Sequence, residues 1–208
     1  MASRKNQLPE VDRLSPVVVK IGGSLLHQGA EIVSVVRSSH RPLLIVPGGG
    51  TFADMVRHSA VNDDAAHWMA IAAMDQYGWM LASWGIGTTD LLEIPGRPCV
   101  LLPYRVMRER DPLPHSWDVT SDTIAAWVAS MLGTDLLLLK SVDGITRRGV
   151  LLPMVSKPVV SDVVDPCFIR FVLKNRVRAY LINGMNTERV KRWLEGEMVP
   201  GTVIGTTF

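Results

Sequence analysis

A lysine and two glycines lie at the end of an apolar run in the segment VVVKIGGS. Gly22 and Gly23 let the backbone turn sharply, and they let its N–H groups approach an anion without a Cβ atom in the way. Lys20 adds a point charge that suits a phosphate, and Ser24 follows directly. The segment is not a Walker A loop, because GxxxxGK[ST] is absent. It predicts either a phosphate-binding loop or a structural turn beside a surface lysine.

Three consecutive glycines, Gly48, Gly49 and Gly50, follow a second apolar run. Ordering three glycines costs backbone entropy that a simple turn does not require. A helix that begins beneath a glycine loop binds anions at its N-terminus, although a tight strand-to-helix connection is the alternative. Ligands bind at the carboxyl ends of the strands in an open α/β sheet. Two glycine loops at that edge are therefore a more specific indication of a ligand-binding site than either loop alone.

Two acidic residues accompany these loops. Asp122 lies in the first turn of a predicted helix. There it either caps the helix and offsets its dipole or orients lysines and Mg²⁺ at a transferring phosphoryl group. Asp143 and Gly144 form a polar turn with Lys140 after a third apolar run, and an ordinary turn is the alternative. For neither acidic residue does its own motif show which of the two interpretations is correct.

The predicted helices after the second glycine loop carry candidates for contacts to a small ligand. Arg57 either reaches a phosphate or faces solvent. Asp63 and Asp64 either cap a helix or pair with a cation. His67 is either a satisfied helix histidine or a residue that binds the ligand. The five histidines show no HxH or HExxH spacing, so no metal site is expected from them.

Short apolar runs alternate with stretches of helical character along the chain. Such runs suit strands buried on both faces of a parallel sheet. The alternation predicts an α/β fold, a three-layer αβα sandwich with a mainly parallel central sheet. Strands are expected at 16–21, 42–46, 99–102, 135–139 and 179–182, and helices at 31–38, 51–59, 64–82, 122–132, 166–175 and 187–194. Residues 145–161 are less regular, and we expect a hairpin or a mobile flap there.

The composition is that of a globular protein of 208 residues, 47% hydrophobic and 20% charged. A formal net charge of +2 gives no electrostatic reason to expect nucleic acid or a membrane as a partner. No stretch reaches the roughly 20 apolar residues that span a bilayer. Residues 1–15 lack a secretory signal and are expected to be a flexible tail before a single domain at 16–208. Two cysteines without a CxxC pair favour a reducing, cytoplasmic location.

Taken in order, the KIGGS segment, the GGG loop, the S-D-T-x-A helix start and the VDG turn resemble the amino acid kinase superfamily. The resemblance covers nearly the whole chain and implies an ATP-dependent kinase of αβα sandwich fold. It implies ATP with Mg²⁺ at the C-terminal half and a small-molecule acceptor at the N-terminal half. Lys20 and Asp122 would be catalytic, and the nucleotide would be bound by Gly22, Gly23, Ser24, Lys140, Asp143 and Gly144. The acceptor would be bound by Gly48, Gly49, Gly50, Arg57, Asp64 and His67.

The stretch DDAAHWMA at 63–70 gives a narrower resemblance, to the archaeal kinases of methanofuran biosynthesis. Their acceptor is an aminomethylfuran phosphate, which becomes a diphosphate. Asp64 would then pair with the ammonium group of the acceptor, and Trp68 would stack on its ring. The alternatives are a nucleoside monophosphate or isopentenyl phosphate as acceptor, or a non-catalytic storage subunit that binds nucleotide or oxyanions.

Two further expectations concern a second lysine and assembly. Many members of the superfamily carry a second catalytic lysine after a late Gly-Gly-Met turn. Here that region reads DPCF, so Lys174 and Lys157 are the candidate substitutes. The predicted helix from Trp68 to Trp84 is apolar on more than one face, so it must be buried by the core, and a partner subunit is expected to cover its other side. We therefore expect a homo-oligomer.

Overall fold

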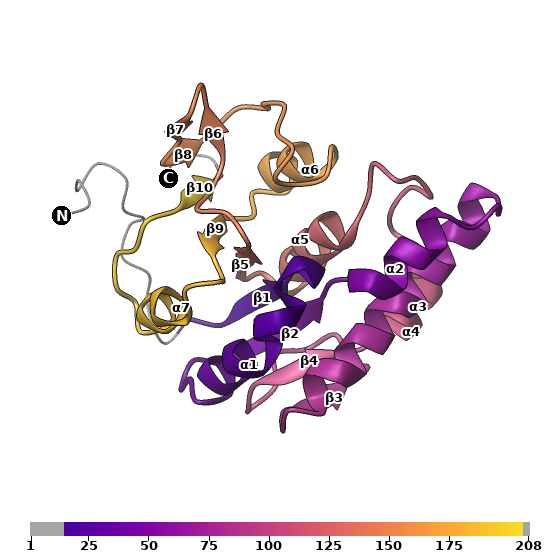
Figure 1. The fold of residues 1–208 in the computed structure, drawn as a ribbon, viewed down its shortest axis with the longest axis horizontal. Helices are drawn as coiled ribbons and strands as arrows, with labels where there is room; N and C mark the ends of the chain where they lie inside the picture. The colour runs from indigo at the N-terminus through magenta and orange to yellow at the C-terminus, as the bar shows by residue number, and fades with distance from the viewer. Residues whose placement is uncertain (1–14, 206–208) are drawn as a thin grey trace.

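The computed structural model describes residues 15–205, so the tail expected at 1–15 lies outside the described residues except for Ser15. The centre of the molecule is an eight-stranded sheet with helices on both sides (Figure 1). From one edge to the other its strands are β3 (Gly87–Thr89), β4 (Cys99–Leu101), β2 (Leu43–Pro47), β1 (Val17–Ile21), β5 (Asp135–Lys140), β9 (Ala179–Asn183), β10 (Thr202–Ile204) and β8 (Met154–Val155).

Neighbouring strands run parallel except for the pair β9 and β10. The central strands β1, β2 and β5 are fully buried or nearly so, as their continuous apolar runs predict. All five expected strands are present, and the expected αβα sandwich with a mainly parallel sheet is confirmed. The short strands β3, β8 and β10 were not expected, since none of them follows from an apolar run of its own.

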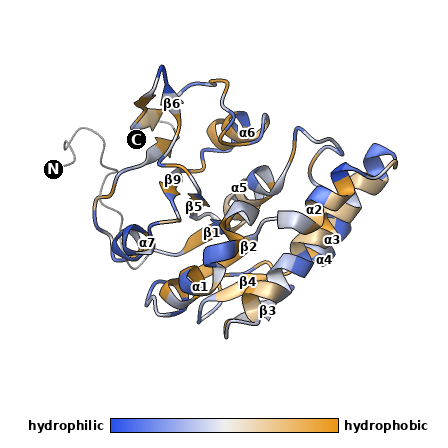
Figure 2. Cartoon of the chain, in the orientation of Figure 1, coloured by the Kyte–Doolittle hydropathy of each residue, from blue (hydrophilic) through white to orange (hydrophobic). Residues whose placement is uncertain are grey.

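Helices cover both faces of the sheet. They are η2 (Gly23–Gln28), a 3₁₀ turn, α1 (Gly29–Arg37), α2 (Gly50–Arg57), α3 (Asp63–Ala82), α4 (Tyr104–Arg110), α5 (Ser121–Leu132), α6 (Phe168–Lys174) and α7 (Thr187–Leu194). Successive strand residues point to opposite faces, so Val18 packs in the core beneath α5 and α6, whereas Val17 and Val19 pack beneath α1 and α7. Figure 2 shows the apolar colouring on β1, β4 and β9 inside these layers.

Residues 145–161 form a hairpin in part, as one of the two sequence interpretations proposed. Strands β6 (Thr146–Arg147) and β7 (Val150–Leu151) pair antiparallel. Arg148 and Gly149 make the turn with positive φ angles of 52° and 77°. Within residues 15–205, no helix is long and apolar enough to cross a membrane.

The sequence motifs lie together where the chain leaves the carboxyl ends of the central strands. β1 ends next to Gly22, β2 ends next to Gly48, and β5 ends at Lys140. These three strands are neighbours and parallel, so their carboxyl ends lie side by side. This is the edge where open α/β sheets bind ligands.

Candidate active site

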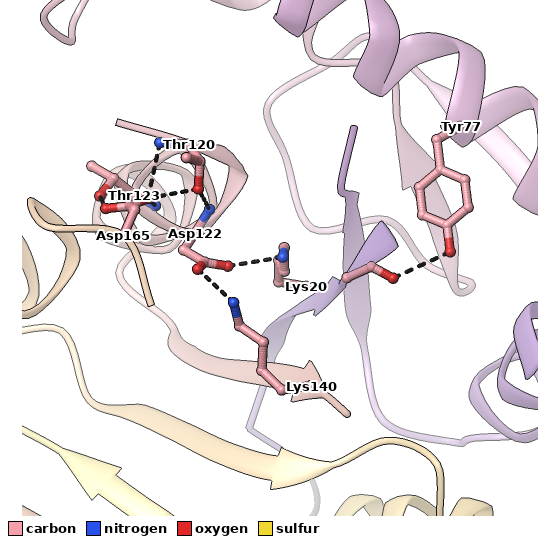
Figure 3. Close-up of polar contacts among 8 residues, drawn as sticks. Lys20, Tyr77, Thr120, Asp122, Thr123, Lys140 and Asp165 are labelled. Carbon is pink, nitrogen blue, oxygen red and sulfur yellow. Dashed lines mark hydrogen bonds and ion pairs between the residues drawn. The ribbon is translucent and has the colours of Figure 1, made fainter. Parts of the chain in front are cut away.

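A buried carboxylate between two lysines lies at this edge (Figure 3). The Nζ atom of Lys20 lies 2.8 Å from Oδ1 of Asp122, and the Nζ atom of Lys140 lies 2.6 Å from Oδ2. Lys20 and Asp122 are only 4% and 3% exposed. The structure thus brings together both residues that the sequence marks as catalytic, and it adds Lys140 to them.

The sheet register explains this convergence. Lys20 on β1 pairs with Leu138 on β5. Lys140 lies two residues further along β5, so it projects from the same face of the sheet as Lys20. Asp122 is the second residue of α5, the helix that packs on that face. Neighbouring strands and one covering helix are therefore enough to position all three groups.

The charges of this cluster do not cancel. Burial alone would raise the pKa of Asp122, but the charges of Lys20 and Lys140 hold that pKa below its ordinary value. Burial, followed by repulsion from Lys20, lowers the pKa of Lys140 to about 8 despite its contact with Asp122. Among these three groups, two ammonium groups face one carboxylate, which leaves one net positive charge. A buried cation of this kind is stabilised when an anion such as a phosphate binds beside it.

Asp165 fixes the start of α5, and hence the place of Asp122. Its Oδ2 accepts hydrogen bonds from the backbone N–H and hydroxyl of Thr120 and from the backbone N–H of Thr123, at 2.9, 2.9 and 3.0 Å, and its Oδ1 accepts from the Thr123 hydroxyl at 2.5 Å (Figure 3). These bonds satisfy N–H groups that a helix N-terminus leaves free. Burial raises the pKa of Asp165, and the charge of Asp122 raises it further. Sequence reasoning did not assign this residue a role.

The two glycine loops touch each other. A Cβ atom built on Gly23 would lie 2.2 Å from the Cα atom of Gly50, and one built on Gly48 would lie 2.8 Å from the backbone nitrogen of Gly23. Gly50 also has a φ angle of +53°, which favours glycine. These contacts require glycine for the close approach. The Gly22 carbonyl also accepts a hydrogen bond of 3.4 Å from the buried Tyr77 hydroxyl (Figure 3).

A cavity of about 500 Å³ opens beside the loops and reaches the residues just before Asp122. Its wall includes six of the predicted site residues, namely Gly23, Ser24, Gly49, Gly50, Arg57 and His67. It also includes Asp63, Trp117 and Thr120, of which only Asp63 was considered for ligand contact from the sequence. The guanidinium carbon of Arg57 lies 4.8 Å from the centre of the Trp117 ring, so these two residues form one part of the wall.

Asp64 and Trp68 lie elsewhere than the sequence analysis places them. Asp63 rather than Asp64 lines the cavity, and the Oδ1 atom of Asp64 lies 2.6 Å from Nδ1 of His115. Trp68 is not part of the cavity wall, and it packs edge-on against Tyr104 and His115. The tryptophan in the cavity wall is Trp117.

His67 and His115 stack on each other, with ring centroids 4.0 Å apart. Burial lowers the pKa of His67, and the neighbouring His115 lowers it further. Hydrogen bonds to Asp111 and Asp64 raise the pKa of His115. The pair therefore combines one imidazole that is harder to protonate than usual with one that is easier to protonate. The contact joins residues 48 positions apart in the sequence, which sequence spacing could not reveal.

The remaining predicted residues lie outside the cavity wall. Asp143 Oδ1 accepts hydrogen bonds from Arg189 and from Asn183, at 2.5 and 3.1 Å. Gly144 has a φ angle of +155° and adjoins Thr202, so it serves the turn after β5. Lys174 ends α6 and Lys157 follows β8, and neither contacts Asp122, whose two oxygens are bound to Lys20 and Lys140.

No family model matches the chain. The chain is 31% identical over 201 residues to [5-(aminomethyl)furan-3-yl]methyl phosphate kinase of Methanocaldococcus jannaschii, covering 86% of this chain and 93% of that protein. Its fold is similar to that of uridylate kinase from Archaeoglobus fulgidus, with a TM-score of 0.69 and 19% identity over 91% of this chain and 99% of that one. It is also similar to an isopentenyl phosphate kinase, with a TM-score of 0.63 and 17% identity over 91% of this chain and 100% of that one.

Proposed function

This chain belongs to the amino acid kinase family and is a phosphotransferase for a small phosphate monoester, and we propose that its acceptor is [5-(aminomethyl)furan-3-yl]methyl phosphate. The observation that carries the proposed chemistry is the buried cluster of Lys20, Asp122 and Lys140 beside two glycine loops. Phosphoryl transfer asks a protein mainly for positioning and for neutralisation of charge. The relative with 31% identity supports the furan acceptor.

In the proposed step, an oxygen of the acceptor phosphate attacks the γ-phosphorus of ATP. A new O–P bond forms as the bond from that phosphorus to the β,γ-bridging oxygen breaks, and ADP leaves with the electron pair. The acceptor phosphate is already anionic at neutral pH, so its oxygen needs no general base. The barrier to transfer comes from the negative charge of the two phosphate groups, and Lys20 and Lys140 offset that charge in a buried site.

The glycine loops suit the phosphates of both substrates. The contact between Gly23 and Gly50 leaves backbone rather than side chains at this part of the cavity wall, and backbone N–H groups bind phosphate oxygens. Mg²⁺ would arrive with ATP and neutralise charge on its phosphates. Both oxygens of Asp122 are bound to lysines, so the phosphates and water would supply the ligands of the ion.

The cavity wall offers a separate place for each part of the proposed acceptor. Gly49 and Gly50, at the start of α2, would hold the phosphate. Trp117 would stack on the flat furan ring. The carboxylate of Asp63, at the start of α3, would pair with the ammonium group. An acceptor with a phosphate at one end and a cation at the other would thus meet the matching charge at each end.

A panel of acceptors tests the proposal. The protein is supplied with ATP, Mg²⁺ and one of three acceptors, [5-(aminomethyl)furan-3-yl]methyl phosphate, isopentenyl phosphate or UMP, and ADP release is followed. We expect kcat/KM to be highest for the furan acceptor, with its diphosphate as product by mass spectrometry. A higher kcat/KM for UMP or isopentenyl phosphate would reject the furan acceptor while leaving the kinase chemistry in place. Absence of ADP release with every acceptor would reject the role given to the lysine cluster.

A further inference from the structure

Two histidines and a carboxylate meet next to the acceptor cavity, outside the lysine cluster. They are His67 on α3, Asp111 at the end of α4 and His115 in the segment between α4 and α5. One ligand atom from each lies within 4.8 Å of the ligand atoms of the other two. His67 is buried, His115 is half-buried and Asp111 is exposed, so an ion from solvent can reach the group.

His67 carries a polar atom that lacks a partner. Its Nε2 atom is buried and has no hydrogen-bond partner among the described residues, and the residue as a whole is 8% exposed. Buried polar atoms are nearly always satisfied in native proteins, so each exception needs a cause. A bound ion would satisfy an imidazole nitrogen, because the neutral ring offers a lone pair there.

His115 is held on both sides by carboxylates. Its Nε2 atom lies 2.9 Å from Oδ1 of Asp111, and its Nδ1 atom lies 2.6 Å from Oδ1 of Asp64. Histidines that bind a metal through one nitrogen almost always donate the other N–H to a carboxylate, carbonyl or water. Asp64 occupies that outer position. Asp64 would therefore be an outer partner of a metal ion bound here, while Asp111 and His115 would be direct ligands.

We propose that His67, His115 and Asp111 bind a divalent transition-metal ion, for which Zn²⁺ is the best match. Two imidazoles and one carboxylate suit Zn²⁺ better than Mg²⁺ or Ca²⁺, which prefer oxygen ligands. Three protein ligands leave a fourth tetrahedral position for water. The two rings now lie nearly parallel, at 20°. Binding therefore requires one ring to tilt, and His115, which lies outside the helices, is the residue that tilts.

The ion would hold two parts of the wall of the 500 Å³ cavity at a fixed distance. His67 lines that cavity from α3, and Trp117 lines it two residues after His115. A metal ion that joins His67 to His115 would therefore fix the distance between α3 and the segment that carries Trp117. The proposal does not depend on the identity of the acceptor, because the ligands all belong to the chain.

Metal titration of the protein itself tests the site. Protein without a histidine tag is stripped with a chelator and titrated with Co²⁺, without ATP or acceptor, while the visible bands of four-coordinate Co²⁺ are recorded. Zn²⁺ is then added as a competitor. We expect one ion per chain, and at least about tenfold weaker binding in His115→Ala and Asp111→Asn. Asp64→Asn should weaken binding about tenfold as well. His40→Ala, which removes an exposed histidine, should bind as the wild type does.

Several outcomes would overturn the proposal. One is a protein that binds neither Co²⁺ nor Zn²⁺, and another is equal affinity in the wild type and Asp111→Asn. Loss of binding in His40→Ala would place the ion elsewhere. Asp111 is exposed, so its substitution keeps the fold even if the histidine variants are unstable. As a second measurement, Zn²⁺ should raise the melting temperature of the wild type but not that of Asp111→Asn. Neither measurement uses enzymatic activity.

Discussion

The Nζ atom of Lys140 lies 2.6 Å from Oδ2 of Asp122, so this lysine takes the side of the carboxylate that Lys20 leaves free. The pairing places two ammonium groups around one buried carboxylate, at the end of two neighbouring parallel strands. The second lysine therefore comes from the strand that precedes the VDG turn. Lys174 and Lys157, which the sequence offered as candidates for the second catalytic lysine, do not contact Asp122.

Removal of Lys140 should abolish most of the activity. In Lys140→Met we expect kcat to fall by at least about 10²-fold, because one buried cation no longer offsets charge at the transferring phosphoryl group. Lys174→Met is the matched control and should turn over at nearly the wild-type rate, since Lys174 lies at the end of α6. Turnover is measured at saturating ATP and acceptor. Near wild-type kcat in Lys140→Met, or a large loss of kcat in Lys174→Met, would show that Lys140 is not the second catalytic lysine.

The lowered pKa of Lys140 predicts a fall in activity at alkaline pH. Burial and repulsion from Lys20 bring this pKa to about 8, and transfer requires the charged ammonium form. The charged form is lost as pH rises through the pKa, so kcat should decline above about pH 8. Lys140→Arg keeps its charge throughout this range, and its decline should move to higher pH. Identical pH profiles for the two proteins would exclude titration of Lys140 as the cause.

The local features of the sequence predicted much of the fold and part of the site. Strands β1 and β5 follow from apolar runs, and the glycine loops and Asp122 follow from motifs that each span only a few residues. The contacts of Asp165 with Thr123 and of His67 with His115 join residues 42 and 48 positions apart, respectively. Such contacts depend on how elements pack, which composition and spacing do not encode directly.

The sequence also could not show which of Asp63 and Asp64 faces the cavity. Both residues lie in the first turn of α3. An α-helix has about 3.6 residues per turn, so neighbouring side chains point roughly 100° apart. Which of them faces the cavity depends on the rotation of the helix about its axis. That rotation is set by packing of α3 against α2 and the sheet, not by the residues at its start.

The contact between the glycine loops predicts a specific response to a single methyl group. In Gly23→Ala the new Cβ would lie 2.2 Å from the backbone of Gly50, so the loops must separate. We expect the free energy of unfolding to drop by about 1–3 kcal/mol and KM to rise for both substrates. Urea denaturation and steady-state kinetics measure the two effects. Gly96→Ala, where nothing lies within 4 Å of the new atom, is the control, and equal behaviour of the two variants would show that the loops tolerate a side chain.

Exposed apolar residues on α3 support the expected homo-oligomer. Met69 and Trp79 are 41% and 59% exposed, and their spacing of ten residues leaves them roughly 80° apart around the helix axis, on the same side of the helix. We propose that this face packs against a second copy of the chain. Trp79→Glu should then give monomers by light scattering, whereas Met131→Glu, on the exposed end of α5, should not. A wild-type protein that is monomeric at working concentration would contradict the proposal.

Asp63 should decide how well the enzyme distinguishes an acceptor with an amine from one without it. Asp63 lines the cavity, whereas Asp64 is bound to His115. Asp63→Asn removes the negative charge that would pair with the ammonium group, and it keeps the size of the side chain. A hydrogen bond to a charged group contributes about 1.5–3 kcal/mol. Asp63 is exposed in the free protein, so we expect the lower end of that range, about a tenfold loss in kcat/KM.

The comparison uses two acceptors and two variants. The first acceptor is [5-(aminomethyl)furan-3-yl]methyl phosphate, and the second has a methyl group in place of the aminomethyl group. Asp63→Asn should lower kcat/KM for the first acceptor while leaving that for the second nearly unchanged. Asp64→Asn should change kcat/KM for both acceptors by the same factor, because Asp64 faces His115 and not the ligand. If Asp64→Asn proves to be the variant that loses the preference for the amine, Asp64 must turn into the cavity when the acceptor binds. If neither variant alters the preference, the ammonium group is recognised by another residue of the wall.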